Sequence, residues 1–266
     1  MNKVLLVLSL SFMSLQGFAF SLLYTSPPRY KGAVEILVVN QNCNNIVPED
    51  LGRAYTVEDL HSDVSAAVAH FWNKNHSSSL RFVVRPEPFD MAGNLLLSEM
   101  LSATPSNRIV IGCSSNATQF SSTGILAGTR MSNADPAKAV VGVNNVSGSA
   151  FATLTQEQRI ATLAHEIGHG LGLGHTSHRD ALMYYAATDD VKVKYLSPDD
   201  ADGATYLYPK KSKFLGLVGG CGLIKDVSKG DGEGMALLIE SVFLVFFYLL
   251  WRKISFKRSA KAMLSR

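Results

Sequence analysis

Four side chains that together can carry out metal-assisted hydrolysis lie in one short stretch, residues 165–175. His165 and His169 are four residues apart, so on a helix both imidazoles project from the same side. Two neutral imidazoles one helical turn apart can bind one Zn²⁺, because Zn–N distances of about 2.0–2.1 Å require converging ligands. Glu166 lies beside them and remains free to act as a general base on a zinc-bound water. The pattern predicts a hydrolytic zinc site.

A third histidine follows a glycine-rich segment. A straight helix would carry His175 about 9 Å along the axis from His169, since each residue rises about 1.5 Å. Gly172 can adopt a left-handed conformation and turn the chain, which brings His175 back as a third ligand. Three protein ligands leave one tetrahedral position for water, whose pKa zinc lowers from about 15.7 towards about 7. A bare His-Glu-x-x-His occurs by chance in surface helices, but the third histidine argues against chance.

The element that must position these ligands is a helix. Thr155 and Gln158 have the spacing of a capping box, which predicts a helix start near Gln156. Apolar residues then recur at helical spacing and predict one stripe facing a core: Ile160, Leu163, Ala164, Ile167 and Leu171.

At these residues the chain resembles a known family. Residues 165–175 resemble the long zinc motif of the metzincin peptidases. Met183, eight residues past His175, resembles the Met-turn of the matrixins, the matrix metalloproteinase branch. The resemblance covers about residues 34–208 and is most specific over residues 165–183. It implies a zinc endopeptidase acting on protein or peptide substrates, and a methionine packed beneath the metal. It also implies an edge strand at residues 124–130 that pairs with extended substrate.

The chain departs from that family in ways that limit the comparison. The histidine and aspartate loop that holds a second, structural zinc is not found. Ca²⁺ is possible but cannot be placed; the pairs Asn144-Asn145 and Asp189-Asp190 are polar loop candidates only. Tyr185 stands where a proline is expected. In the astacin and serralysin branches a tyrosine at this spacing reaches the zinc or the developing oxyanion, so we hypothesise that role for Tyr185.

The expected fold is an α+β metzincin-like domain with a mixed, twisted sheet and packed helices. Thr56 with Asp59, and Ser197 with Pro198, mark two more helix starts. Residues 95–101 are either a short helix or a loop. The predicted strands are residues 33–39, 80–84, 108–112, 125–131 and 139–143.

Segments with other roles are expected at both ends. Residues 1–19 read as a signal peptide, residues 20–32 as a lead, and residues 33–209 as the catalytic domain. Residues 210–234 read as a flexible stalk. Residues 235–251 read as a transmembrane helix, and residues 252–266 as a basic cytoplasmic tail that leaves the zinc domain outside the cytoplasm. Alternatively, the C-terminal helix is a transient sorting signal and the mature enzyme is released.

Charge and cysteines narrow the class of protein. Taking Lys3 and the six tail cations from the 25 basic residues leaves 18 against 22 acidic ones, so a nucleic-acid-binding face is not indicated. Three cysteines suit an exported protein with one disulfide, which we expect between Cys43 and Cys113, with Cys221 left over. Glycosylation triplets, relevant only in a eukaryotic secretory pathway, begin at three asparagines: Asn75, Asn116 and Asn145.

The sequence therefore predicts a membrane-anchored zinc endopeptidase outside the cytoplasm. Its single Zn²⁺ is bound by His165, His169 and His175, and its water is activated by Glu166. The alternative is a non-proteolytic surface interaction module with a structural zinc. Glu166 argues against that alternative, because a purely structural site does not need it. The sequence does not indicate the substrate or the oligomeric state.

Overall fold

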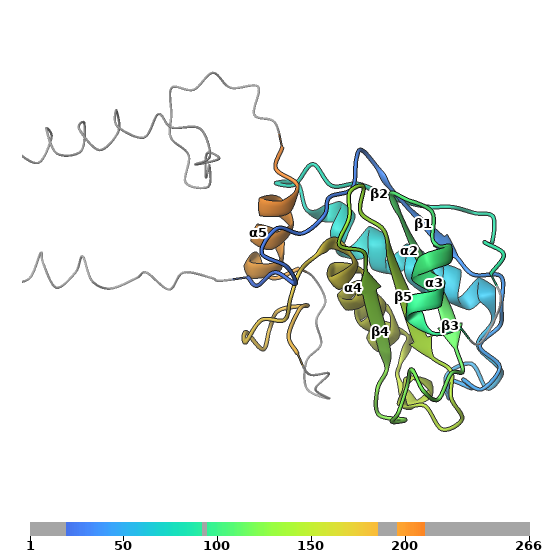
Figure 1. Cartoon of the computed structure of the whole chain (residues 1–266). Helices are drawn as coiled ribbons and strands as arrows, with labels where there is room; N and C mark the ends of the chain where they lie inside the picture. The colour runs from blue at the N-terminus through green and yellow to red at the C-terminus, as the bar shows by residue number, and fades with distance from the viewer. Residues whose placement is uncertain (1–19, 92–94, 186–195, 211–266) are drawn as a thin grey trace, which may run out of the picture. The chain divides into compact units, whose positions relative to one another are not determined.

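The computed structural model describes residues 20–91, 95–185 and 196–210 (Figure 1). Its centre is a five-stranded sheet with the order β2-β1-β3-β5-β4. Neighbouring strands are parallel except at one edge, where β4 runs antiparallel to β5. The predicted mixed sheet is confirmed. The strands are β1 (Val34–Val38), β2 (Phe82–Val84), β3 (Arg108–Ser114), β4 (Ala127–Met131) and β5 (Ala139–Asn144).

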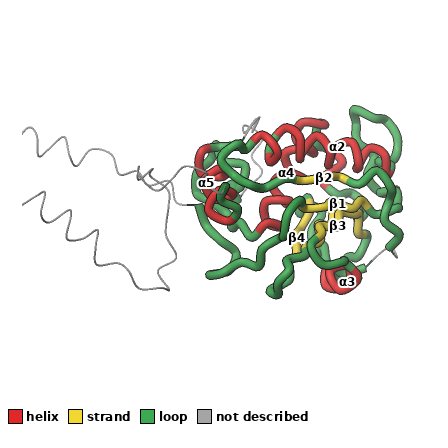
Figure 2. Tube along the Cα trace, turned by 90° about the horizontal axis from the view of Figure 1, so that it is seen from above, coloured by secondary structure: helices red, strands yellow, loops and turns green. Residues whose placement is uncertain are grey.

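Helices cover both faces of this sheet. Figure 2 shows α2 (Val57–His70) on one side and α3 (Leu97–Ala103) on the other. The zinc-motif helix α4 (Gln156–Leu171) packs beside α2, and α5 (Pro198–Leu207) follows near the end of the described chain. Two 3₁₀ turns complete the order, η1 (Trp72–Lys74) and η2 (Ala150–Thr153). Because helices cover both faces, β3 and β5 are buried almost throughout, as expected for parallel strands.

Local capping sets where three helices begin. The Thr155 side chain accepts from the Gln158 N–H, while the Gln158 side chain accepts from the Thr155 N–H at 2.9 Å. The same reciprocal box forms at Thr56 with Asp59 and at Ser197 with Asp200. Each box satisfies backbone donors that the first helical turn leaves unpaired. All three predicted starts are confirmed.

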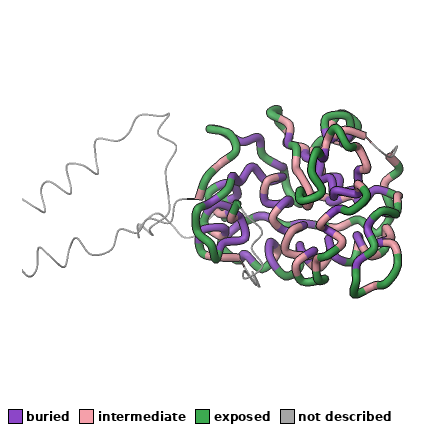
Figure 3. The backbone as a smooth tube through the Cα atoms, turned by 90° about the horizontal axis from the view of Figure 1, so that it is seen from below, coloured by how far each residue is buried: buried purple, intermediate pink, exposed green. Residues whose placement is uncertain are grey.

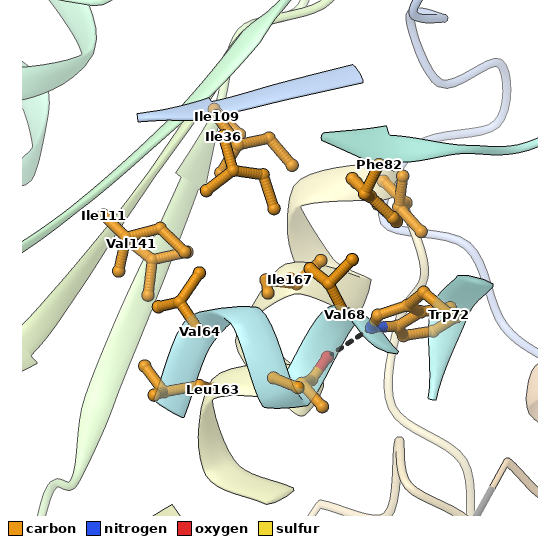
Figure 4. Close-up of a cluster of buried hydrophobic side chains, with 14 of the residues drawn as sticks. Ile36, Val64, Val68, Trp72, Phe82, Ile109, Ile111, Val141, Leu163 and Ile167 are labelled. Carbon is orange, nitrogen blue, oxygen red and sulfur yellow. Dashed lines mark hydrogen bonds between the residues drawn. The ribbon is translucent and has the colours of Figure 1, made fainter. Parts of the chain in front are cut away.

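The larger core lies between the sheet and helices α2 and α4 (Figure 4). Ile36 and Ile109 from the sheet face Val64 and Ile167 from the two helices. The indole N–H of Trp72 donates to the Ala164 carbonyl at 2.9 Å, which ties η1 to the middle of α4. In Figure 3 the buried segments run through the interior, and many connecting loops are exposed. The helix that carries the zinc motif is therefore fixed from several sides.

A smaller core on the opposite face answers the question left open for residues 95–101. Leu97 and Met100 of α3 pack on Val110 and Val140 of the sheet. The segment is thus a short helix, and it extends to Ala103. Its apolar side chains cover the face of the sheet that α2 and α4 leave open.

The predicted disulfide joins Cys43 to Cys113, with 5.6 Å between their Cα atoms. Cys43 follows β1, while Cys113 lies within β3, which runs two residues further than predicted. The bridge therefore joins the carboxyl end of β3 to the segment that follows its parallel neighbour β1. Cys221 lies outside the described residues.

Two of the three glycosylation triplets start at buried asparagines. Asn75 and Asn145 are each 6% exposed. The Asn75 amide donates to the Ala201 carbonyl at 3.1 Å, and the Asn145 oxygen accepts from the Asn45 N–H at 3.0 Å. Both amides are therefore inaccessible in the folded domain, whereas Asn116 is partly exposed.

The expected signal peptide, most of the stalk, the transmembrane helix at 235–251 and the basic tail lie outside the described residues. Within the part of the chain that the structure describes, no helix has the length and apolar character needed to cross a bilayer.

Candidate active site

The second half of α4 carries three of the four predicted site residues. His165, Glu166 and His169 follow one another along the helix, which ends at Leu171 and is capped by Gly172 with φ 102°. That left-handed conformation is strained for other residues, and the Gly172 N–H caps the helix by donating to the Gly168 and His169 carbonyls. The predicted turn is confirmed. It reverses the chain and brings His175 back beside the helix.

The three histidines converge. One ring nitrogen from each of His165, His169 and His175 lies within 4.8 Å of the others. The Nε2 atoms of His169 and His175 are 3.1 Å apart. Around a tetrahedral zinc with Zn–N of about 2.0–2.1 Å, ligand nitrogens are about 3.3 Å apart, so this spacing fits a shared metal ion. A direct hydrogen bond between these two Nε2 atoms would need a proton on one of them. For His169, the other ring contact disfavours a proton on Nε2.

Backbone carbonyls set the tautomers of the two helical histidines. The Nδ1 of His165 donates to the Leu182 carbonyl at 2.7 Å, and the Nδ1 of His169 donates to the Leu173 carbonyl at 2.8 Å. With its proton on Nδ1, each ring presents an Nε2 lone pair to the convergence point. Burial also lowers the pKa of both rings, that of His169 to about 4, so both are neutral at pH 7. The donor set is prepared for a divalent cation.

The Met-turn lies directly against the zinc helix. At Gly168 an added Cβ would collide with the Met183 sulfur, so only glycine lets this methionine approach the helix between His165 and His169. Met183 is 3% exposed. It occupies the packed position that the resemblance implied.

Asp200 at the start of α5 holds the Met-turn in place. Its carboxylate accepts from the Leu182 N–H at 2.7 Å and from the Met183 N–H at 3.0 Å. The carbonyl of the same Leu182 orients His165. A buried carboxylate on α5 is therefore connected to the proposed metal ligand His165 through the backbone of one residue, Leu182.

The N-terminal segment supports the third ligand. Ser21 Oγ donates to the His175 carbonyl at 2.7 Å. The Leu23 N–H donates to the Gly172 carbonyl at 2.9 Å, and the Gly174 N–H donates to the Ser21 carbonyl at 2.8 Å. Residues 21–23 thus form a short antiparallel strap along the loop that ends in His175. No sequence pattern indicated this role for the predicted lead.

Glu166 lies beside the histidines and is 8% exposed. Burial raises the pKa of its carboxyl, while His169, the Thr129 hydroxyl and His175 oppose that rise. Thr129 Oγ1 on β4 is 2.6 Å from Glu166 Oε2. A carboxylate in this setting is a suitable proton acceptor, and its partner on β4 was not anticipated from the sequence.

Tyr185 ends the described Met-turn segment. It is 64% exposed, and its ring lies 4.5 Å from that of Tyr184, measured between centroids. Its hydrogen bond with Tyr184 raises the Tyr185 pKa. These contacts do not test whether Tyr185 reaches the zinc or the oxyanion, so that role stays a prediction.

Within the described residues, the histidine triad is the one set of three or more His, Cys, Asp or Glu side chains placed to share a metal. Asn144, a possible calcium ligand, instead donates to the Ile125 carbonyl at 2.7 Å and accepts from the Val146 N–H. Asp189 and Asp190 lie outside the described residues. A calcium site stays a prediction.

Comparison with known proteins decides the family. A family model described as Matrixin matches residues 49–209, more than half of the chain and all of the site. The chain belongs to the matrixin family. His165, His169 and His175 form the zinc-binding triad typical of matrixins.

Individual matrixins are similar over shorter stretches. Metalloendoproteinase 2-MMP of Arabidopsis thaliana is 39% identical over 120 residues, which cover 39% of this chain and 32% of that protein. Stromelysin-1 of Rattus norvegicus is 49% identical over 47 residues, or 17% of this chain and 10% of its own length. Matrilysin of Felis catus is 46% identical over 56 residues, covering 20% and 21%. The chain thus matches about a third or less of the length of these relatives.

Proposed function

We propose that this matrixin is a zinc-dependent endopeptidase that hydrolyses peptide bonds outside the cytoplasm. The observation that carries the proposal is the convergence of His165, His169 and His175 beside the buried carboxylate of Glu166. Three protein ligands leave a fourth tetrahedral position open, which is the arrangement of a catalytic rather than a structural zinc.

The residues divide the chemistry between them. His165, His169 and His175 would hold the ion, which when bound supplies a Lewis acid and a water of lowered pKa. Glu166 takes the proton from the attacking water and delivers it to the leaving amine. Burial keeps the Glu166 carboxylate poorly hydrated and raises its pKa above the ordinary value of a glutamate, which makes the carboxylate a stronger proton acceptor.

Strand β4 supports substrate binding in this proposal. It is the last strand of the sheet, so one of its two edges has no partner strand among the described residues. An extended peptide adding to that edge would gain main-chain hydrogen bonds. The strand lies beside α4, because Thr129 contacts Glu166, so a peptide there would run close to the proposed base.

The second candidate is a surface interaction module whose zinc is only structural. Structural zinc sites are usually closed by four protein ligands, and they need no adjacent carboxylate base. The triad with Glu166 favours the enzyme.

The deciding experiment uses the purified full-length chain, assayed for zinc content and for cleavage of a mixed peptide library, with Glu166→Gln in parallel. We expect one zinc per chain in both proteins, and cleavage only in the wild type. Zinc without cleavage in either protein would favour the interaction module. Equal turnover in both would show that Glu166 is not the base.

We further propose that the chain is exported and anchored by residues 235–251. The Cys43–Cys113 disulfide supports an oxidising compartment. Measuring the mass of the mature protein in membrane and medium fractions tests the anchor. Intact chains in the membrane fraction support retention, whereas shortened chains in the medium support the alternative of a transient sorting signal.

A further inference from the structure

We propose that Thr129 of β4 is a positioning residue for Glu166: its hydroxyl fixes the carboxylate in the orientation that catalysis needs. The inference rests on the proposed endopeptidase function. It assigns a role to a side chain on a different element from the zinc motif, 37 residues away in sequence.

Strand geometry aims Thr129 at the zinc helix. In the β4–β5 register Thr129 pairs with Val141, whose side chain lies in the core that α2 and α4 cover. Side chains directly opposite in an antiparallel pair share one face of the sheet. At the next position along the strand, Gly128, an added Cβ would point towards Leu97 on the other face, at 3.6 Å. The alternation of the strand thus places the Thr129 hydroxyl against α4.

The hydroxyl has two acceptors within reach and one proton to give. Thr129 Oγ1 is 2.6 Å from Glu166 Oε2 and 3.0 Å from the Glu166 carbonyl oxygen. The carbonyl lies inside α4, where the helical pattern supplies it with the N–H four residues on. The carboxylate oxygen is the closer acceptor, and hydrogen bonds to ionised acceptors are the stronger ones. The Thr129 hydroxyl therefore donates its hydrogen bond to Oε2 of Glu166 and not to the carbonyl oxygen.

That bond has a consequence for the reaction. A glutamate side chain has several rotatable bonds, and fixing its carboxylate before the reaction spares that ordering during proton transfer. With Oε2 held by Thr129, the other carboxylate oxygen is left to meet the water. Because β4 is also the proposed substrate-binding edge, the peptide and the base are positioned by the same strand.

The test compares three variants of the full-length chain. Thr129→Val keeps the shape and removes the hydroxyl, and Thr129→Ser keeps the hydroxyl and removes the methyl group. Thr162→Val is the matched control, because the Thr162 hydroxyl bonds only to the Gln158 carbonyl within α4, at 2.9 Å. If Thr129→Val is unfolded by circular dichroism, Thr129→Ala replaces it.

We expect Thr129→Val to lower kcat about tenfold while KM stays within about twofold, since an interaction that orients a base acts on the chemical step. Thr129→Ser and Thr162→Val should keep wild-type kcat. Zinc content should be one per chain in every variant. In infrared difference spectra, the carboxylate band that disappears in Glu166→Gln should shift in Thr129→Val and keep its place in Thr129→Ser.

Three results would overturn the inference: an unchanged kcat in Thr129→Val, a loss confined to KM, or equal impairment of the Ser and Val variants, which would indicate packing alone. If the wild-type chain cleaves no peptide, the proposed function fails. The infrared comparison then still decides whether the hydroxyl holds the carboxylate, so the two failures can be told apart.

Discussion

The two halves of α4 carry polar clusters of opposite design. Near its start, Arg159 is 1% exposed and all its charge is matched: it contacts Asp63 through Nε at 3.2 Å and Asp50 through two bonds of 3.0 Å. Asp63 also accepts from the Tyr55 hydroxyl at 2.6 Å. Near the end of the helix, His165 and His169 are neutral, and each donates its Nδ1 proton to a backbone carbonyl, so that its Nε2 lone pair is presented to the convergence point of the triad.

The difference teaches how one helix serves two purposes. In the Arg159 cluster the charged groups hydrogen-bond to one another, so the cluster's role is to join α4 to α2 and to the loop at Asp50. In the histidine cluster, the outer nitrogens of His165 and His169 donate to backbone carbonyls, and their inner nitrogens are left for a metal. The paired charges of Arg159 hold the helix in place, and the ring nitrogens without a backbone partner at the other end can bind the ion.

The largest effect should come from breaking the incomplete cluster. His175→Ala removes one of three ligands, so we expect loss of bound zinc and of all measurable peptide cleavage. The fold should survive, because the core and the Arg159 cluster do not depend on His175. Metal analysis, a peptide assay and far-UV circular dichroism check this; a variant that retains stoichiometric zinc would contradict it.

Breaking the Arg159 cluster should have the reverse effect: stability falls while activity is kept. Arg159→Ala leaves the buried Asp63 carboxylate without its cation, which typically costs about 3–5 kcal/mol of unfolding free energy. Cleavage per folded molecule should stay near wild type, because the histidines keep their carbonyl partners. Denaturant unfolding measures the loss. Arg159→Met combined with Asp63→Asn removes both charges and should recover part of it; no recovery would show that the charge pair is not the cause.

A smaller effect is expected at the strap. Ser21→Ala removes the hydroxyl that donates to the His175 carbonyl, a bond worth about 0.5–1.5 kcal/mol. Zinc affinity should fall by about 2- to 10-fold, as measured by competition with a chelator. The contribution of Arg159 to the free energy of unfolding should be unchanged. Ser132→Ala, which alters a hydroxyl bonded within its own loop, is the control. Equal affinity in wild type and Ser21→Ala would show that the strap does not position His175.

The smallest effect concerns an exposed ion pair, a contrast to the buried Arg159 cluster. The hydrogen bond from Arg53 lowers the pKa of Asp59 to about 2, against about 3.9 in an unfolded chain. A lowered folded-state pKa contributes stability above the unfolded value, and that contribution is lost as pH falls through about 2. Arg53→Gln should therefore weaken stability slightly near pH 5 and less near pH 2. A difference that grows on acidification would refute this sign.

Features fixed by short-range chemistry were predictable. The zinc motif and the three helix starts depend on residues at most a few positions apart, so spacing alone indicates them. The left-handed turn at Gly172 belongs to the same class. Strand ends were less predictable: β3 runs to Ser114 rather than residue 112, because it continues pairing with β5 to its last residue.

By itself, then, the sequence determined which side chains form the metal site and which helix carries them, because periodicity and capping are local. Only the tertiary structure decided what holds those side chains: Ser21 reaches His175 across 154 residues, Asp200 reaches the Met-turn from α5, and Thr129 reaches Glu166 from the sheet edge. Such partners depend on the register of strands and the course of loops, which no local pattern encodes. The metal ligands come from one short sequence motif, and their orientation is set by distant segments that folding brings together.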